Sequence, residues 1–133
     1  MLGRVTYQGF AEVFGGQSGG MADQMNNFPK VVVSTTLKSA DWQNSTLISD
    51  NALEEISKLK QQPGRNINVS GSATLIRWLL NEGLLDQLDL LLFPSVVGTG
   101  KRLFEDGSDH VALKLADSKA FTNGVLHLTY QPA

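Results

Sequence analysis

The hydrophobic pattern of residues 66–100 predicts the centre of the fold. Residues 66–70 alternate between polar and apolar with the period of a short strand, and residues 88–93 are almost wholly apolar, as in a strand covered on both faces. Between them lies the apolar stripe of an amphipathic helix, which Gly83 ends. The stripe consists of Leu75, Ile76, Leu79 and Leu80. We therefore expect a βαβ unit with a turn at Gly71 and Ser72.

The turn before this helix is the strongest candidate for a ligand site. Gly71 lets the backbone approach a ligand closely, and the first amides of a helix have no partner within it. With the positive end of the helix dipole, those amides favour a phosphate group, and Ser72 and Thr74 add hydroxyls. The alternative is that Gly71 and Ser72 form only a tight turn and a helix cap. The pattern alone leaves both interpretations open.

Two strands and two helices are expected in the first half of the chain. Thr6 is expected to cap a helix over residues 7–14, and residues 46–48 predict a short strand. A further helix begins at Asp50 or Asn51. Its inner side chains are expected to be Leu53, Ile56 and Leu59, with Glu54 and Lys58 paired one turn apart.

A second candidate for ligand binding ends the β-branched run of residues 30–36, which predicts a buried strand. Ser34, Thr35 and Thr36 carry three successive hydroxyls there. Ligands of open α/β sheets bind at strand ends, so these hydroxyls are candidates for a phosphate or a ribose. Ordinary β propensity explains the same residues equally well.

The end of the chain predicts an antiparallel hairpin. Residues 111–115 and 126–130 each alternate between apolar and polar, and Asn123-Gly124 between them is the strongest short hairpin signal. The whole pattern predicts an α/β fold with a mixed sheet, in which parallel crossovers come first and the antiparallel hairpin last. With 133 residues, the chain is expected to form a single domain.

Composition and charge narrow the classes of function. A net charge of −2 argues against a nucleic-acid partner, and no apolar run is long enough for a membrane span. The absence of cysteine excludes thiolate chemistry and disulfides, so a cytoplasmic location is expected. The two histidines, His110 and His127, lack the spacing of a metal site, and no metal is expected. No catalytic triad can be assembled.

One hydrolase motif also occurs in the sequence. Residues 16–20 satisfy the G-x-S-x-G pattern with Ser18 at its centre. A nucleophile elbow must lie between a strand and a helix, whereas a helix is expected before this segment. A serine hydrolase that uses Ser18 is therefore a weak functional hypothesis.

Three segments together resemble one family. They are Gly3-Arg4-Val5-Thr6-Tyr7, the run 31–37 (VVVSTTL), and residues 69–75 (VSGSATL) followed by 83–86 (GLLD) and 93–100 (FPSVVGTG). In order and spacing they resemble the dihydrofolate-reductase-like superfamily, in particular the reductase domain of the bifunctional deaminase-reductase of riboflavin biosynthesis and its stand-alone bacterial relatives. The resemblance covers nearly the whole chain. It implies a three-layer α/β fold, whose mixed and mostly parallel sheet has helices on both faces and ends in a C-terminal antiparallel hairpin.

The resemblance implies an oxidoreductase that uses NADPH and transfers hydride to a small heterocyclic substrate. The implied reaction resembles that of 5-amino-6-(5-phosphoribosylamino)uracil reductase or of dihydrofolate reductase. It gives the cofactor-binding role to three groups of residues. These are Gly3, Arg4 and Thr6; Ser34, Thr35, Thr36 and Leu37; and Gly71, Ser72, Ala73, Thr74 and Leu75. No catalytic residue is implied.

The chain departs from this family at its start. Relatives begin with a central strand and a loop of the S-L-D-G type, and this sequence starts after both. We therefore expect a chain shortened at its N-terminus, whose open sheet is covered in a homodimer or higher homo-oligomer. The alternative function is a catalytically silent remnant that binds nucleotide or serves a structural role.

Overall fold

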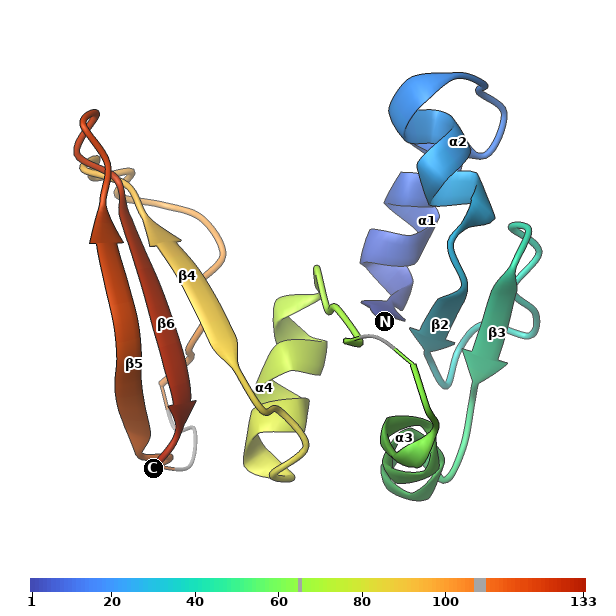
Figure 1. Ribbon diagram of the computed structural model, residues 1–133. Coiled ribbons are helices and arrows are strands. Elements are labelled where there is room, and N and C mark those ends of the chain that lie inside the picture. The colour runs from blue at the N-terminus through green and yellow to red at the C-terminus, as the bar shows by residue number, and fades with distance from the viewer. Residues whose placement is uncertain (65, 107–109) are drawn as a thin grey trace. The chain divides into compact units, whose positions relative to one another are not determined.

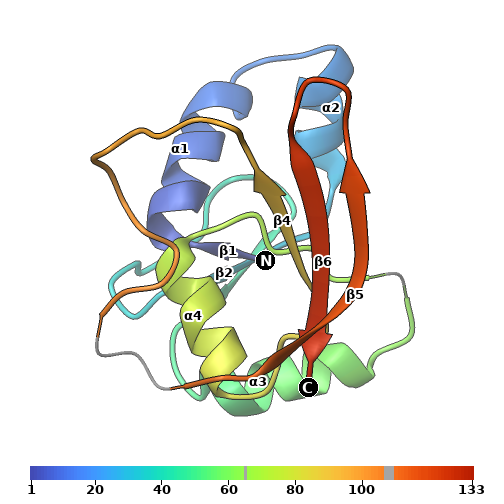
Figure 2. The ribbon, with the colours of Figure 1, turned by 90° about the vertical axis from the view of Figure 1, so that its left-hand side faces the viewer.

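The computed structural model describes residues 1–64, 66–106 and 110–133 (Figures 1 and 2). The chain forms two compact units, Met1–Ile76 and Arg77–Ala133. The first unit combines helices with parallel strands, and antiparallel strands dominate the second, which confirms the predicted α/β class. The single-domain organisation stays a prediction. No helix in the described ranges has the length and apolar character that a membrane span requires.

A parallel sheet forms the frame of the first unit (Figure 1). Its strands are β1 (Leu2–Gly3), β2 (Lys30–Val33) and β3 (Ser45–Ile48), in the order β1-β2-β3. The register pairs Gly3 with Val33 and Val33 with Ile48. The helices of this unit are α1 (Arg4–Phe14), α2 (Gly20–Asn27) and α3 (Ala52–Gln61). The predicted strands near residues 30 and 46 are confirmed.

The core of this unit includes Trp42. The Trp42 side chain is buried with Leu2, Tyr7 and Val32. Its indole N–H donates to Asn26 Oδ1 at 2.6 Å, and its backbone N–H donates to Tyr7 Oη at 2.9 Å. Both hydrogen-bond partners lie far from Trp42 in the sequence, so no local sequence pattern predicts that the Trp42 side chain is buried.

Lys30 is the one buried lysine of this core, and its charge has local partners. Its ammonium donates to the backbone carbonyls of Met25, Asn26 and Phe28, at 2.7, 3.1 and 3.0 Å. It also lies 4.1 Å from the centroid of the Trp42 ring. All three ammonium protons therefore have acceptors, which is what burial of a lysine requires.

One helix prediction in this unit was wrong at its start, and a second helix was not predicted. Helix α1 begins at Arg4 with Gly3 as its N-cap, so Thr6 lies inside the helix and does not cap it. The strand β1 ends directly before the helix, and this leaves no room for a separate capping turn. Helix α2 was not predicted, because its segment GMADQMNN carries no continuous apolar stripe.

The helix α3 matches its prediction except at one side chain. It has Asn51 as N-cap, and Lys58 forms an ion pair with Glu54 at 3.3 Å. Ile56 is 1% exposed, as expected of an inner position, but Leu53 is 47% exposed. The buried stripe is narrower than the periodicity suggested, because α3 buries only the centre of its apolar face.

The predicted βαβ unit of residues 66–100 was wrong in its strands. Residues 66–70 form no strand, and only Gly71 makes an isolated parallel bridge, to Leu2. The N-terminal ammonium group of Met1 also donates to Asn68 O at 2.7 Å, so this segment follows β1 without a full ladder. A ladder needs a partner of equal length, and β1 has two residues. The second expected strand is present at residues 88–92, but it pairs antiparallel with its neighbour and not parallel. The hydrophobic run predicts a strand, whereas the direction of pairing depends on the partner strand.

The helix of that unit was predicted correctly and is α4 (Ala73–Asn81). Leu75 and Leu79 are buried, at 7% and 2% exposure. Gly83 ends the helix with a φ of +71°, where a residue without Cβ is favoured. The Leu84 N–H donates to Leu79 O at 2.9 Å and the Gly83 N–H to Leu80 O at 3.2 Å, which is the Schellman pattern of a helix end.

An antiparallel sheet makes up most of the second unit (Figure 2). Its strands are β4 (Leu88–Leu92), β5 (Leu113–Ala120) and β6 (Leu126–Pro132), in the order β4-β6-β5. The predicted hairpin joins β5 to β6, with Gly124 at a φ of +90° in its turn. The expectation that residues 88–93 are covered on both faces was wrong, because Leu91 and Phe93 are 59% and 60% exposed.

Candidate functional site

The three predicted binding segments meet at one edge of the parallel sheet in Met1–Ile76. Since β1 and β2 run parallel with Gly3 opposite Val33, Arg4 and Ser34 directly follow neighbouring strand ends. The Gly3 N–H donates to Gly71 O at 3.0 Å, which brings the third segment to the same edge. In open α/β sheets this carboxyl edge is where ligands bind. The three segments that the sequence analysis grouped together are therefore close to one another in the structure.

Glycine is required at two of these positions by close packing. Gly71 has a φ of +155°, and a Cβ there would lie 2.7 Å from Thr6 Oγ1. A Cβ on Gly3 would lie 2.5 Å from Ser72 Oγ. The turn after β1 and the turn before α4 thus approach each other so closely that side chains are excluded. The Gly71-Ser72 peptide bond in this turn is cis.

The turn at Gly71 and Ser72 was interpreted either as a ligand site or as a tight turn with a helix cap, and the start of α4 is compatible with both. Ser72 Oγ accepts a hydrogen bond from the Leu75 N–H at 3.3 Å, so the serine caps the helix. Ala73 and Thr74 open the helix, and the amide of Ala73 has no carbonyl acceptor within it. The side chain of Leu75 is buried in the core. A ligand at this turn would therefore meet the amide of Ala73.

The segment after β2 uses two of its predicted hydroxyls for its own structure. Ser34 is 8% exposed, and its Oγ accepts hydrogen bonds from the backbone N–H groups of Thr36 and Leu37, both at 3.2 Å. The hydroxyls of Ser34 and Thr36 are also hydrogen-bonded to each other at 3.2 Å. Leu37 packs against the core of the unit. Thr35 and Thr36 are exposed, and so is Lys38, which the sequence interpretation did not include. The signal for Lys38 was a cation two residues after the hydroxyl run.

The electrostatics of this edge favour an anion. Helices α1 and α4 both begin here, and neither has an acidic residue in its first turn. The positive ends of two helix dipoles therefore stay uncompensated by carboxylates. Arg4 is exposed on the first turn of α1, where its Nη1 donates to Gln8 Oε1 at 3.1 Å. A guanidinium has five N–H donors, so this single bond leaves Arg4 able to bind phosphate.

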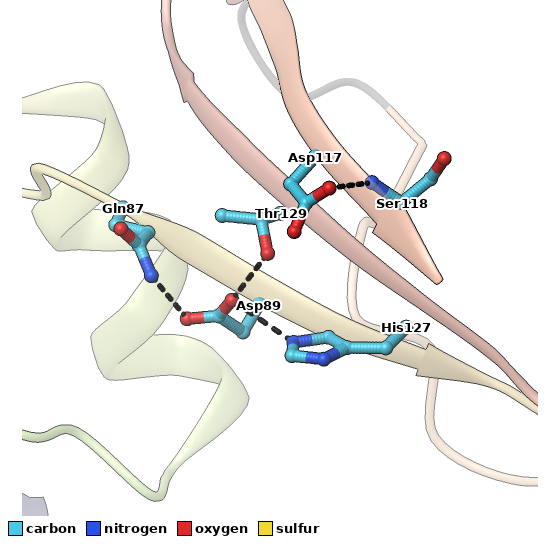
Figure 3. A network of polar contacts seen from close by, with 6 residues as sticks. All are labelled: Gln87, Asp89, Asp117, Ser118, His127 and Thr129. Atoms are coloured by element: carbon cyan, nitrogen blue, oxygen red, sulfur yellow. Dashed lines mark hydrogen bonds and ion pairs between the residues drawn. The ribbon is translucent and has the colours of Figure 1, made fainter. Parts of the chain in front are cut away.

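A separate polar cluster lies on the sheet of the second unit (Figure 3). Asp89 accepts hydrogen bonds from Gln87 Nε2 and Thr129 Oγ1, each at 2.8 Å, and lies 3.1 Å from His127 Nε2. The hydrogen bond from Gln87 is the largest cause that lowers the pKa of Asp89, and Thr129 and His127 add to it. His127 lies on the strand β6. In the described ranges, no three His, Cys, Asp or Glu side chains are grouped to hold a metal.

The second unit also contains a cavity of about 280 Å³. Its polar lining includes Arg77 and His110. The Arg77 guanidinium already donates to the carbonyls of Arg102 and Leu103, at 3.1 and 2.8 Å, and pairs with Glu105 at 3.2 Å. Arg77 therefore holds the loop after β4 in place, and the edge of the parallel sheet is the better candidate for a ligand.

Comparison with known proteins gives the family. The RibD C-terminal domain family matches residues 1–127. The chain belongs to the RibD C-terminal domain family. The resemblance inferred from the three segments is thereby confirmed, and this family is related to reductases.

Two relatives of this RibD C-terminal domain chain come from Bacillus subtilis (strain 168). YyaP, an uncharacterized protein, is 41% identical over 101 residues, which are 76% of this chain and 53% of YyaP. YwjB, also uncharacterized, is 31% identical over 80 residues, which are 60% of this chain and 46% of YwjB. The chain thus spans about half the length of the curated relatives it matches.

Solved structures share the fold at low sequence identity. A putative riboflavin biosynthesis protein from Shewanella sp. PV-4 matches with a TM-score of 0.78 and 18% identity, over 99% of this chain and 72% of its own. A pyrimidine reductase-like protein from Corynebacterium diphtheriae matches with a TM-score of 0.65 and 17% identity, over 99% of this chain and 74% of its own. RibD from Acinetobacter baumannii matches with a TM-score of 0.54 and 20% identity, over 89% of this chain and 35% of its own.

Proposed function

We propose that this chain is an NADPH-dependent reductase that transfers hydride to a small heterocyclic substrate. The observation that carries the proposal is the meeting of three segments at one sheet edge, where Gly3 N–H donates to Gly71 O and Ser34 follows the neighbouring strand. Two helix starts and one exposed arginine supply the positive potential that a dinucleotide polyphosphate needs. Membership of the RibD C-terminal domain family supports the same assignment.

The cofactor would be held mainly by backbone groups and cations. The amide of Ala73, at the start of α4, would bind the diphosphate together with Arg4, which is a forked donor. The hydroxyls of Thr35 and Thr36 would bind the ribose on the adenosine side. Lys38 is exposed next to these hydroxyls, where its charge suits a 2′-phosphate and would favour NADPH over NADH.

The cofactor would supply the reacting hydride, and the protein would hold the cofactor in the orientation that the reaction requires. When bound, the dihydronicotinamide ring supplies a hydride, and the substrate takes up one proton as well. The residues of this edge would fix the cofactor, so that hydride transfer becomes a step between oriented partners. The substrate proposed is a pyrimidine or pterin ring, as in 5-amino-6-(5-phosphoribosylamino)uracil reductase or dihydrofolate reductase. The names of two solved relatives, a riboflavin biosynthesis protein and a pyrimidine reductase-like protein, support this class.

One observation favours a second candidate, a nucleotide-binding protein without turnover. The residues assigned to the cofactor contain no carboxylate and no imidazole, and their ionisable side chains are the cations of Arg4 and Lys38. A general acid for the substrate proton would then have to come from elsewhere. NADPH oxidation with pyrimidine, pterin and carbonyl acceptors separates the two candidates, since turnover by this chain rejects the silent one.

Titration with NADPH, followed by the quenching of protein fluorescence, tests the binding site. Arg4→Ala should weaken NADPH about 10- to 100-fold, because a hydrogen bond to a charged group contributes roughly 1.5–3 kcal/mol. Lys38→Ala should weaken NADPH but leave NADH nearly unchanged. Lys114→Ala, which removes an equally exposed cation on β5, is the matched control and should leave both affinities unchanged. Absence of saturable NADPH binding by the unmodified chain would refute the proposal.

A further inference from the structure

A short glycine-rich, basic loop of the second unit surrounds a concave surface of its own. Residues 98–102 (GTGKR) lie in the connection that follows β4 (Figure 1). These five successive residues line a cavity of about 380 Å³. Because every lining residue comes from one continuous segment, the shape of this cavity depends on the loop itself. The function proposed above assigns no role to any of these residues.

The backbone of this loop changes handedness from residue to residue. Gly98 and Gly100 have φ values of +84° and +131°, whereas Thr99 between them has a negative φ. A change of handedness between neighbouring residues directs their N–H groups to one concave side of the chain, where anions bind. Positive φ values favour glycine, because a Cβ is strained there. The sequence of residues 98–100 therefore suits a backbone shaped for an anion.

The hydrogen-bond donors of the loop have no partner in the described part of the protein. None of the N–H groups of residues 98–102 donates to a described carbonyl or side chain, and neither does the Thr99 hydroxyl. The side chains of Lys101 and Arg102 form no ion pair with a described residue. By contrast, the next charged side chain, Glu105, is paired with Arg77 at 3.2 Å. The donors and the positive charges of the loop are thus available to a ligand.

A contact from α4 fixes the end of the loop. Arg77 Nη1 donates to the backbone carbonyls of Arg102 and Leu103, at 3.1 and 2.8 Å. Only carbonyl groups of the loop are used in this contact, so its N–H groups and the guanidinium of Arg102 keep their donors. A loop that is already held in place loses less conformational entropy when it binds a ligand.

We propose that residues 98–102 form a binding site for a phosphate monoester. The backbone N–H groups and the Thr99 hydroxyl supply hydrogen bonds, Lys101 supplies a point charge, and Arg102 supplies a forked donor. The whole chain has a net charge of −2, so the attraction of an anion to this loop is local. Arg102 stands where nucleoside-triphosphate loops have the Ser or Thr that binds magnesium, and a monoester therefore fits better than a magnesium–triphosphate complex.

NMR titration of the ¹⁵N-labelled chain with ribose 5-phosphate tests the proposal. The amide signals of residues 98–102 should shift and reach saturation, and ribose without a phosphate should leave them unchanged. Titration with inorganic phosphate separates two sources of the same chemistry. Tighter binding of ribose 5-phosphate would assign the site to a phosphorylated small molecule, and equal affinity would assign it to free phosphate. Absence of a saturable shift in these amides with both phosphate compounds would overturn the proposal.

Four variants test the side chains of the loop. Lys101→Gln should weaken ribose 5-phosphate about tenfold, and Arg102→Lys should also weaken it, because the charge remains but the fork is lost. Thr99→Val removes a hydroxyl at constant charge and should weaken binding roughly 2- to 10-fold. Lys114→Gln, on β5 of the same unit, is the matched control and should leave the affinity unchanged. Equal losses in Lys101→Gln and Lys114→Gln would indicate unspecific attraction and overturn the proposal, and the spectrum of each variant reports its fold.

Discussion

Replacing Gly71 by alanine should destabilise the first unit strongly, because two separate penalties coincide there. The φ of +155° is a conformation that residues with a Cβ rarely adopt, which costs about 1–3 kcal/mol. The new Cβ would also lie 2.7 Å from Thr6 Oγ1, so the turn before α4 or the first turn of α1 must move. Together we expect a loss of about 2–4 kcal/mol in the free energy of unfolding.

Thermal and urea unfolding of the purified variant measure this loss. For a chain of 133 residues, it corresponds to a fall of roughly 10 °C in Tm. Thr6→Ala on the Gly71→Ala background should restore part of the stability, because it removes the clash and leaves the backbone strain. Gly9→Ala is the matched control: Gly9 lies inside α1 with no atom within 4 Å of its added Cβ, so alanine should stabilise by about 0.5–1 kcal/mol. Unchanged stability of Gly71→Ala would refute the packing of these two turns.

Three further predictions concern other parts of the chain. Ile56→Ala should cost about 2–5 kcal/mol in urea unfolding, whereas Leu53→Ala, on the same helix but 47% exposed, should cost far less; equal losses would contradict the narrow buried stripe of α3. Gly83→Ala should cost about 1 kcal/mol and Gly83→Asn less, since asparagine tolerates the φ of +71°; equal stability of both with the unmodified chain would contradict the Schellman end. Gln87 and its neighbours lower the pKa of Asp89 below the ordinary value of 3.8, so this group contributes stability above that pH and loses it as the pH falls through the lowered pKa. Unfolding between pH 5 and pH 2 should therefore be less pH-dependent in Asp89→Asn, and identical profiles would contradict the network.

Much of the candidate site could be grouped from the sequence, because its residues belong to short local motifs. A glycine before an apolar stripe predicts a turn and a helix start, and hydroxyls after a β-branched run predict a strand end. The sequence did not reveal that the hydroxyl oxygens of Ser34 and Ser72 accept local hydrogen bonds from backbone N–H groups, at 3.2 and 3.3 Å. Those bonds depend on the geometry of each turn, which a pattern of residue types does not specify.

The sequence by itself determined the elements whose signals are local: the amphipathic helix α4 with its end at Gly83, the ion pair on α3, and the hairpin at Asn123-Gly124. Tertiary structure decided everything that depends on a distant partner. The burial of Trp42 depends on Asn26 and Tyr7. The loss of a strand at residues 66–70 depends on the shortness of β1, and the antiparallel direction of β4 on its pairing with β6. Periodicity records which face of a segment is apolar, whereas pairing and burial are properties of two segments at once.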